Sequence, residues 1–309
     1  MATENKLEEL GKLIGNELCV TEIEADQLLN DMDTHSPTSK INCNFYLIKC
    51  TAVKIREEDF LQFIRRKVIQ YTLKKSDYDD LKTEDYIDVS FKAIDKFTSN
   101  ENSGEVGELI LYFLLEGHEK AIQILNKMDL KTSKEMHYHG LDGIHMAVNN
   151  DEVILYYGES KMHNDLSTAT SKAVGSVKKF ISDPKKEKFE LEVVSSNIDE
   201  SKFGKFKDEI CNYLNPYYPD KEMFKNTHAI FIGYDWNKLK LEDWDGKENL
   251  TEYLKKEYEK ELFKISKSME NKISGRTDIK DDFFKIFFIP FSSVDNARKI
   301  FRELLENKK

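Results

Sequence analysis

Helical and strand-like spacings of apolar residues alternate along most of this chain. Over residues 57–74, one helix face is marked by the recurrence of Phe60, Ile64, Val68 and Tyr71, which predicts a helix. Residues 41–55 are instead rich in β-branched and aromatic side chains, which favour a strand. Further strands are predicted at 189–195, 228–234 and 283–291, and further helices at 164–181, 201–214, 250–273 and 294–305. This alternation is typical of an α/β domain with a central mixed sheet flanked by helices.

An almost wholly apolar helix is predicted from Val106 to Leu115, and such a helix packs inside a domain. Two glutamates interrupt its beginning. Glu105 follows Asn102 at the spacing of a capping box, so helix capping accounts for it. Glu108 lies a turn further along, where no cap needs it, and burying an unpaired carboxylate is costly. We therefore predict that Glu108 is a ligand.

The next stretch predicts a β-hairpin, with strands over 136–148 and 152–161 joined by a polar turn. Asp142 is the one acid on the apolar face of the first strand. Glu159 and Lys161 end the apolar face of the second strand. With a two-residue loop, the numbers of paired residues sum to 301, so Asp142 faces Glu159. The Cβ atoms of such a pair are about 5 Å apart.

Two carboxylates that face each other on a buried surface repel, so a cation is expected between them. A hard divalent cation with oxygen ligands, Mg²⁺ or Mn²⁺, suits such a pair. Lys161 shares the same face, and we expect Glu108 to point to the same spot from its helix. An Asp and a Glu-x-Lys triplet are weak evidence alone, because such triplets are common in charged chains. Their position on apolar faces is what favours a metal site.

A helix glutamate, a strand aspartate and a Glu-x-Lys strand, in this order, resemble the PD-(D/E)XK nuclease superfamily. The segments GEVGELILYFLL, HGLDGIH and YYGESK are similar to the HamA family, the effector subunits of the Hachiman anti-phage defence system. The matching segments cover roughly a third of the chain. The motif aspartate lies in Leu141-Asp142-Gly143, so a leucine stands where the superfamily's name has a proline. Many members of the superfamily also lack that proline.

The resemblance implies a PD-(D/E)XK nuclease-like core with elaborations at both ends. It implies that Asp142 and Glu159 are metal ligands and that Glu108 completes the shell, directly or through water. Lys161 would position or activate the attacking water. The resemblance also implies a HamB-type helicase as a partner in a heteromeric complex, and DNA as the target during infection.

Metal-assisted phosphodiester hydrolysis, by a metal-dependent endodeoxyribonuclease, is therefore the expected chemistry. Lys161 either stays protonated and stabilises the transition state or acts as a base, and one metal or two would fit. A second class is a catalytically inactive nuclease-fold subunit that binds and regulates the helicase or nucleic acid. A third is a hydrolase that uses paired carboxylates as general acid and base, which the adjacent lysine and the helix acid fit less well.

The composition bounds the class of protein. The chain has 309 residues, 34% of them charged, with a net charge of -10, which is typical of a globular protein. We expect residues 1–98 to form an N-terminal extension packed on a core at 99–309, together one compact unit. Apolar runs are far too short for a membrane span. The four cysteines lack metal or disulfide spacing, so we expect free thiols, a cytoplasmic location and no membrane partner.

Net acidity disfavours a free-standing DNA-binding protein, because such proteins gain affinity from lysine and arginine contacts to phosphates. The charge balance reverses downstream of Lys161, where lysines cluster. Hydroxyls and backbone N–H groups at the start of the predicted helix at 164–181 can also bind a phosphate. We expect Ser171, Lys172 and Lys178 to contact nucleic acid, with the helicase supplying most of the affinity. An ordinary solvated helix face is the alternative.

Overall fold

The structure is a computed structural model of the chain. It describes residues 2–79, 82, 85–97, 104–126, 128, 141–149, 152–183, 185, 188, 192–193, 198, 200–215, 224–275 and 282–306.

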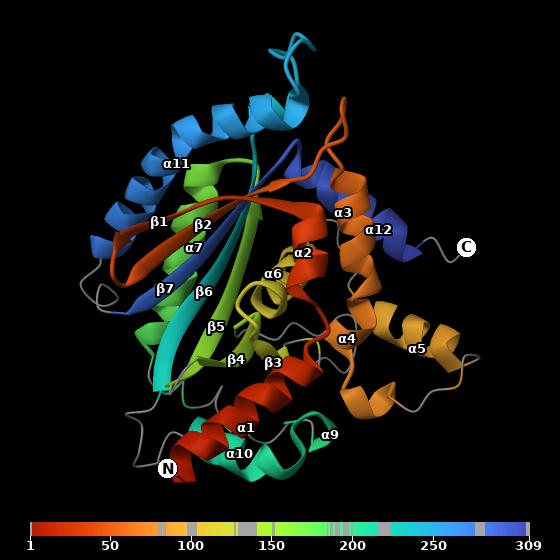
Figure 1. The fold of residues 1–309 in the computed structure, drawn as a ribbon, viewed down its shortest axis with the longest axis vertical. Helices are drawn as coiled ribbons and strands as arrows, with labels where there is room; N and C mark the ends of the chain where they lie inside the picture. Colours follow the sequence, from red (N-terminus) through yellow and green to blue (C-terminus); the bar gives the residue numbers. More distant parts are fainter. Residues whose placement is uncertain are drawn as a thin grey trace.

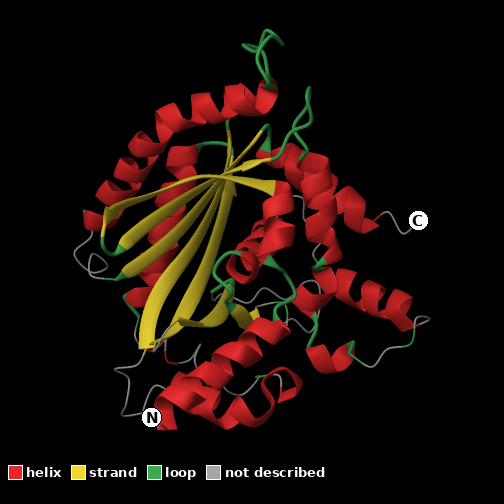
Figure 2. Ribbon diagram, in the orientation of Figure 1, coloured by secondary structure: helices red, strands yellow, loops and turns green. Residues whose placement is uncertain are grey.

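A mixed sheet of seven strands, counted over these residues, forms the centre of the molecule (Figures 1 and 2). Its strand order is β1-β2-β7-β6-β5-β4-β3. The middle strands β2, β7, β6 and β5 run parallel, whereas β1, β4 and β3 pair antiparallel with their neighbours. The strands are β1 (Leu29–Thr38), β2 (Ile41–Ile48), β3 (Ile122–Asn126), β4 (Gly143–Asn149), β5 (Glu152–His163), β6 (Phe224–Asp235) and β7 (Phe283–Phe291). The predicted α/β architecture with a central mixed sheet is therefore confirmed.

Helices cover both faces of the sheet. One face is covered by α7 and α11, whose apolar side chains pack with those of β2, β6 and β7. The other face is covered by α6, with α2, α3, α4, α5 and α12 around it. A third apolar cluster joins α1 and α10 to the β3–β4–β5 side of the sheet. The helices are α1 (Ala2–Glu17), α2 (Glu22–Leu28), α3 (Glu57–Arg66), α4 (Val68–Thr72), α5 (Asp85–Ile94), α6 (Glu105–Gly117), α7 (Leu166–Ile181), α9 (Glu200–Phe203), α10 (Lys207–Leu214), α11 (Leu250–Ser274) and α12 (Val294–Glu306).

The segment expected to be an N-terminal extension contributes two strands to the sheet. β2 pairs with β7, and β1 lies outside β2 as an outer strand of the sheet. β1 is largely polar and contains Pro37, which has no N–H to donate, so this strand belongs at an edge. Because its side chains are mostly polar, the sequence did not predict it as a strand.

Several predicted elements have different bounds in the structure. The predicted helix over 57–74 is interrupted at Lys67, which separates α3 from α4. The strand over 41–55 ends at Ile48, and β3 was not predicted at all. The prediction of a strand over 189–195 is wrong at the two residues that the structure describes, Glu192 and Val193, which are helical. The other residues of that prediction lie outside the described residues.

Two further observations concern the class of protein. All four cysteines are free thiols, as predicted. In the part of the chain that the structure describes, no helix is both long and apolar enough to cross a membrane.

Candidate active site

The β4–β5 hairpin has the register that the sequence predicts. Gly143 pairs with Gly158 and Val148 pairs with Val153, so the paired numbers sum to 301. Asp142 lies one residue before β4, and its backbone N–H still donates to the carbonyl of Gly158 at 3.0 Å. The first predicted strand is shorter than expected where it is described, and residues 136–140 lie outside the described residues.

The side chain of Asp142 continues the pairing where the backbone of β4 stops. Its Oδ2 accepts a hydrogen bond from the backbone N–H of Ser160 at 2.7 Å. In a regular ladder this N–H would donate to a backbone carbonyl of the neighbouring strand. The Asp142 carboxylate is therefore held at the edge of β5, between the two faces of the sheet.

Glu159 lies on the face of β5 that α7 covers. It is 7% exposed, and Ser176 of α7 forms a side-chain hydrogen bond with it. Burial, and then the negative charge of Asp142, raise the pKa of Glu159 to about 7, although Lys161 and Ser176 oppose this shift. Because Asp142 directly precedes the Gly143–Gly158 pair, the register of the hairpin sets it beside Glu159.

Lys161 sits beside this pair. Its Nζ forms an ion pair with Glu159 Oε1 and donates to the carbonyl of Ser160 at 3.1 Å. The Lys161 side chain is 30% exposed, whereas that of Glu159 is 9% exposed. The ammonium group thus lies at the solvent side of the buried carboxylate, where a substrate can reach it.

Glu108 approaches from the face of β5 opposite to Glu159, whereas we expected it to point to the same spot as the hairpin charges from a shared face. A Cβ added to Gly107 of α6 would lie 3.2 Å from Ser160 Oγ and Met162 Cγ, which are on the other face of β5. A Cβ at Gly158 would lie 3.2 Å from Leu111 of α6. The two glycines therefore allow α6 to pack tightly against that face.

Tyr71 of α4 is the site residue that sequence reasoning missed. It is 1% exposed, and its hydroxyl donates to Glu108 Oε2 at 3.3 Å. Burial raises its pKa, and the charges of Glu108, Asp142 and Glu105 raise it further. Asp142 is therefore close enough to influence Tyr71 on one face and Glu159 on the other. The spacing of the predicted helix at 57–74 marked Tyr71 as buried but gave no sign of its partner.

Glu105 is also buried in the first turn of α6, at 5% exposure. The residue at the N-cap is Gly104, which makes no side-chain capping bond. Asn102, the predicted capping partner, lies outside the described residues.

Of the three predicted carboxylate ligands, two are placed where they can bind one divalent cation directly. Asp142 and Glu159 offer hard oxygen donors whose mutual repulsion a cation would relieve. However, no three His, Cys, Asp or Glu side chains of the described residues converge closely enough to hold a metal together. In this arrangement the pair can be direct ligands, and Glu108 can join them through water rather than by direct coordination.

The three predicted nucleic-acid contacts all lie on α7. Asp165 caps this helix by accepting the Thr168 N–H at 2.7 Å, so ordinary capping explains the acid at its start. Ser171 Oγ accepts a hydrogen bond from Lys272 of α11 at 2.8 Å. Lys172 is exposed and Lys178 is half-buried. Nothing in these contacts tests whether Ser171, Lys172 and Lys178 touch nucleic acid, and that stays a prediction.

The fold and the hairpin define a mixed α/β protein in which a buried glutamate and a lysine, Glu159 and Lys161, lie on the central strand β5, with Asp142 beside them just before β4. The HamA family model matches residues 24–305, and the chain belongs to the HamA family. It is therefore a component of the Hachiman anti-phage defence system, as the sequence motifs predicted. A search of curated proteins found no match. The likeness to the PD-(D/E)XK superfamily stays a prediction.

Proposed function

We propose that this chain is a metal-dependent DNA nuclease that hydrolyses phosphodiester bonds and acts under the control of a partner helicase. The observation that carries the proposal is the position of Asp142 beside the buried Glu159 at one end of the hairpin, with Lys161 paired to the same glutamate. Buried groups with strongly shifted pKa values and a specific charged partner are typical of functional sites. Membership of the HamA family supports a role for the chain in defence.

Each side chain has a role that follows from its contacts. Asp142 and Glu159 would hold the cation, and the Ser160 N–H fixes the orientation of the Asp142 carboxylate. A divalent cation, when bound, supplies a water of lowered pKa and neutralises charge that develops on the phosphate. The Lys161 ammonium group pairs with Glu159 and donates to the carbonyl of Ser160, so we assign it the stabilisation of the transition state. Tyr71 orients Glu108 and is a positioning residue.

Plasmid degradation tests the proposal. The purified chain, alone and with a partner helicase and ATP, is incubated with plasmid DNA in Mg²⁺ or in a chelator. Degradation should require Mg²⁺ and should be lost in Glu159→Gln and Lys161→Ala. Glu152→Gln is the matched control, because Glu152 is an exposed residue at the other end of the same strand. Mg²⁺-dependent degradation that survives in Glu159→Gln would contradict the assignment.

Two observations favour a second candidate, a catalytically inactive nuclease-fold subunit that regulates the helicase or binds nucleic acid. Glu108 lies on the far face from Glu159, and three ligands do not converge among the described residues. For this candidate, DNA stays intact in every condition, while the chain alters the ATPase rate of the helicase.

A further inference from the structure

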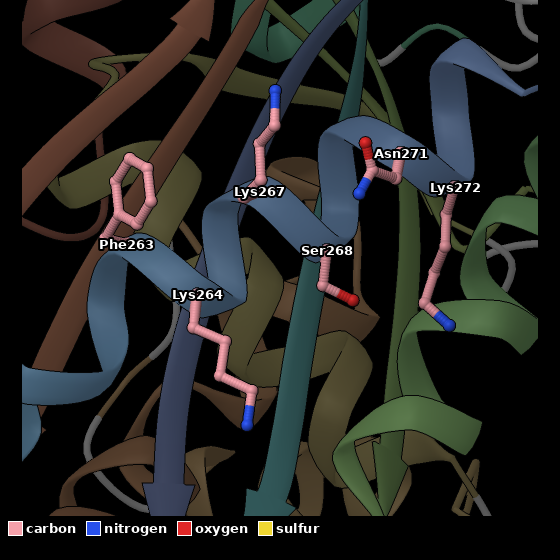
Figure 3. A pocket seen from close by; sticks show the side chains of 6 residues that line it. All are labelled: Phe263, Lys264, Lys267, Ser268, Asn271 and Lys272. Carbon is pink, nitrogen blue, oxygen red and sulfur yellow. The ribbon is translucent and has the colours of Figure 1, made fainter.

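An open pocket of about 520 Å³ lies along the second half of α11, away from the acid pair. Figure 3 shows its side chains projecting from successive turns of the helix, with Lys272 directed toward α7. Its lining consists of Phe263, Lys264, Lys267, Ser268, Asn271 and Lys272. The volume is within the range of ligand sites in proteins, and the side chains that line it are accessible from solvent.

The pocket is basic in a chain that is acidic overall. Three of its six lining residues are lysines and none is a carboxylate, whereas the whole chain has a net charge of -10. Lys267 pairs with Glu270 at 2.6 Å. Among the described residues, neither Lys264 nor Lys272 forms an ion pair. The local excess of positive charge favours an anionic ligand.

Phe263 lies among these cations. It is 70% exposed, although the neighbouring Leu262 and Ile265 of the same helix are buried against the sheet. The core of the protein therefore does not account for Phe263. An exposed aromatic ring beside lysines is the combination by which proteins bind single-stranded nucleic acid, with bases stacked on rings and phosphates held by cations. A protein-binding surface would instead have a larger apolar centre.

The pocket is continuous with α7. Lys272 Nζ donates to Ser171 Oγ at 2.8 Å and lies 3.3 Å from Ser167 Oγ. Lys172 is exposed next to Ser171, and Ser176, one turn further along α7, bonds to Glu159. Polar and basic side chains therefore connect the α11 pocket to the candidate active site.

We propose that this surface of α11 binds a single strand of DNA, with a base stacked on Phe263 and phosphates held by Lys264 and Lys267. The inference rests on the proposed nuclease function, because it assigns where the substrate strand lies outside the acid pair. Ser268 and Asn271 supply hydrogen-bonding groups between the ring and Lys272.

Binding measured without cleavage tests the inference. The full chain is titrated against a fluorescent single-stranded oligonucleotide and against its duplex, with a chelator present, and anisotropy is recorded at several salt concentrations. The variants are Phe263→Ala and the double variant Lys264→Glu/Lys267→Glu. The matched control is Lys256→Glu/Lys260→Glu, at exposed positions in the first half of the same helix. Circular dichroism confirms that each variant folds.

Loss of one stacked base should raise the Kd of Phe263→Ala for the single strand by about 5- to 100-fold, and the Kd for the duplex should change little. The double lysine variant should raise Kd about tenfold or more and flatten the slope of log Kd against log salt by at least about 1. The control variant should stay within about twofold of the original chain.

Three outcomes would overturn the inference. The first is a wild-type chain that binds no single strand at low salt, and the second is unchanged affinity in both pocket variants. The third is unchanged DNA binding with lost binding of the partner helicase, which would make the surface a protein contact. Plasmid cleavage in Mg²⁺ is scored separately. A chain that cleaves but shows one of these outcomes therefore retains the proposed function and loses only this inference.

Discussion

The carboxylate of Asp142 accepts the backbone N–H of Ser160 at 2.7 Å. This one bond places a charged side chain at the edge of β5, where a neighbouring strand would otherwise offer a carbonyl group. It explains how Asp142 can influence the pKa of Glu159 on one face of the sheet and of Tyr71 on the other.

Two variants of Asp142 distinguish the effect of its charge on DNA cleavage from the effect of its hydrogen bond to Ser160 on stability. Asp142→Asn keeps an acceptor oxygen, so its free energy of unfolding should change by less than about 1 kcal/mol while DNA cleavage is lost. Asp142→Ala removes the acceptor as well and should destabilise the protein by about 1–3 kcal/mol. Urea unfolding of both variants measures the difference. Equal stability in the two variants would show that the bond contributes nothing.

Cation binding should depend on pH through Glu159. Its pKa is raised to about 7, so the side chain is mostly protonated at about pH 6 and mostly ionised at about pH 8. A cation must displace this proton at the lower pH, and its affinity should therefore fall about tenfold between the two.

Thermal unfolding with Mg²⁺ provides the measurement for this pH effect. The rise in Tm on adding Mg²⁺ should be larger at the higher pH and absent in Glu159→Gln. Glu152→Gln should keep it. A rise in Tm that is the same at both pH values would mean that Glu159 is not a ligand.

Tyr71→Phe tests whether Glu108 belongs to the site. The substitution keeps the buried ring and removes only the hydroxyl that donates to Glu108 Oε2. A hydrogen bond to a charged group contributes about 1.5–3 kcal/mol, so we expect DNA cleavage to fall roughly 10-fold or more. The double variant Tyr71→Phe/Glu108→Gln is compared with Glu108→Gln alone. The two should cleave DNA at the same rate if Tyr71 acts only through Glu108. Full activity in Tyr71→Phe would separate Glu108 from the chemistry.

Acid should destabilise the protein through buried histidines. His228 is 4% exposed, with ring contacts to Tyr157 and Phe284, and its Nδ1 has no hydrogen-bond partner among the described residues. Burial lowers its pKa from 6.5 to about 4, so the unfolded chain takes up the proton first as pH falls. Stability is therefore complete above pH 6.5 and is lost toward pH 4. The loss at about pH 5 is about 2 kcal/mol.

His228→Phe should remove this part of the acid sensitivity, because phenylalanine suits the aromatic surroundings and carries no proton. Denaturant unfolding at about pH 5 and pH 8 measures it. His163→Phe, at a partly exposed position, serves as the comparison variant for the exchange of an imidazole ring for a phenyl ring. The buried His145, whose pKa burial lowers to about 3, leaves a residual acid sensitivity in both variants. An unchanged pH dependence in His228→Phe would contradict the burial effect.

The acid pair was predictable because a strand alternates its side chains and a short turn fixes the register. The pairing of Gly143 with Gly158 follows from the sequence in this way, and so does the closeness of Asp142 to Glu159. The side-chain bond from Asp142 to Ser160 was not predictable, because it depends on where β4 ends.

The face on which α6 packs could not be predicted, for a physical reason. A helix that is apolar on all sides has no polar stripe to show which side meets solvent, so its sequence is compatible with either face of the sheet. The glycines that decide the matter, Gly107 and Gly158, show their effect only once β5 and α6 are brought together. The partnership of Tyr71 with Glu108 follows from the same packing.

The outer strand β1 also limits how the protein can associate. In the part of the chain that the structure describes, no strand pairs with its outer edge, and the strand carries the acidic residues Asp31 and Asp33 and a proline that cannot donate a backbone hydrogen bond. A strand from another polypeptide that paired with β1 would meet an interrupted row of backbone N–H donors and repulsion from negative charges. These residues of β1 oppose aggregation by the addition of strands to this edge of the sheet. Replacing Pro37 would weaken that protection and leave the candidate active site unchanged.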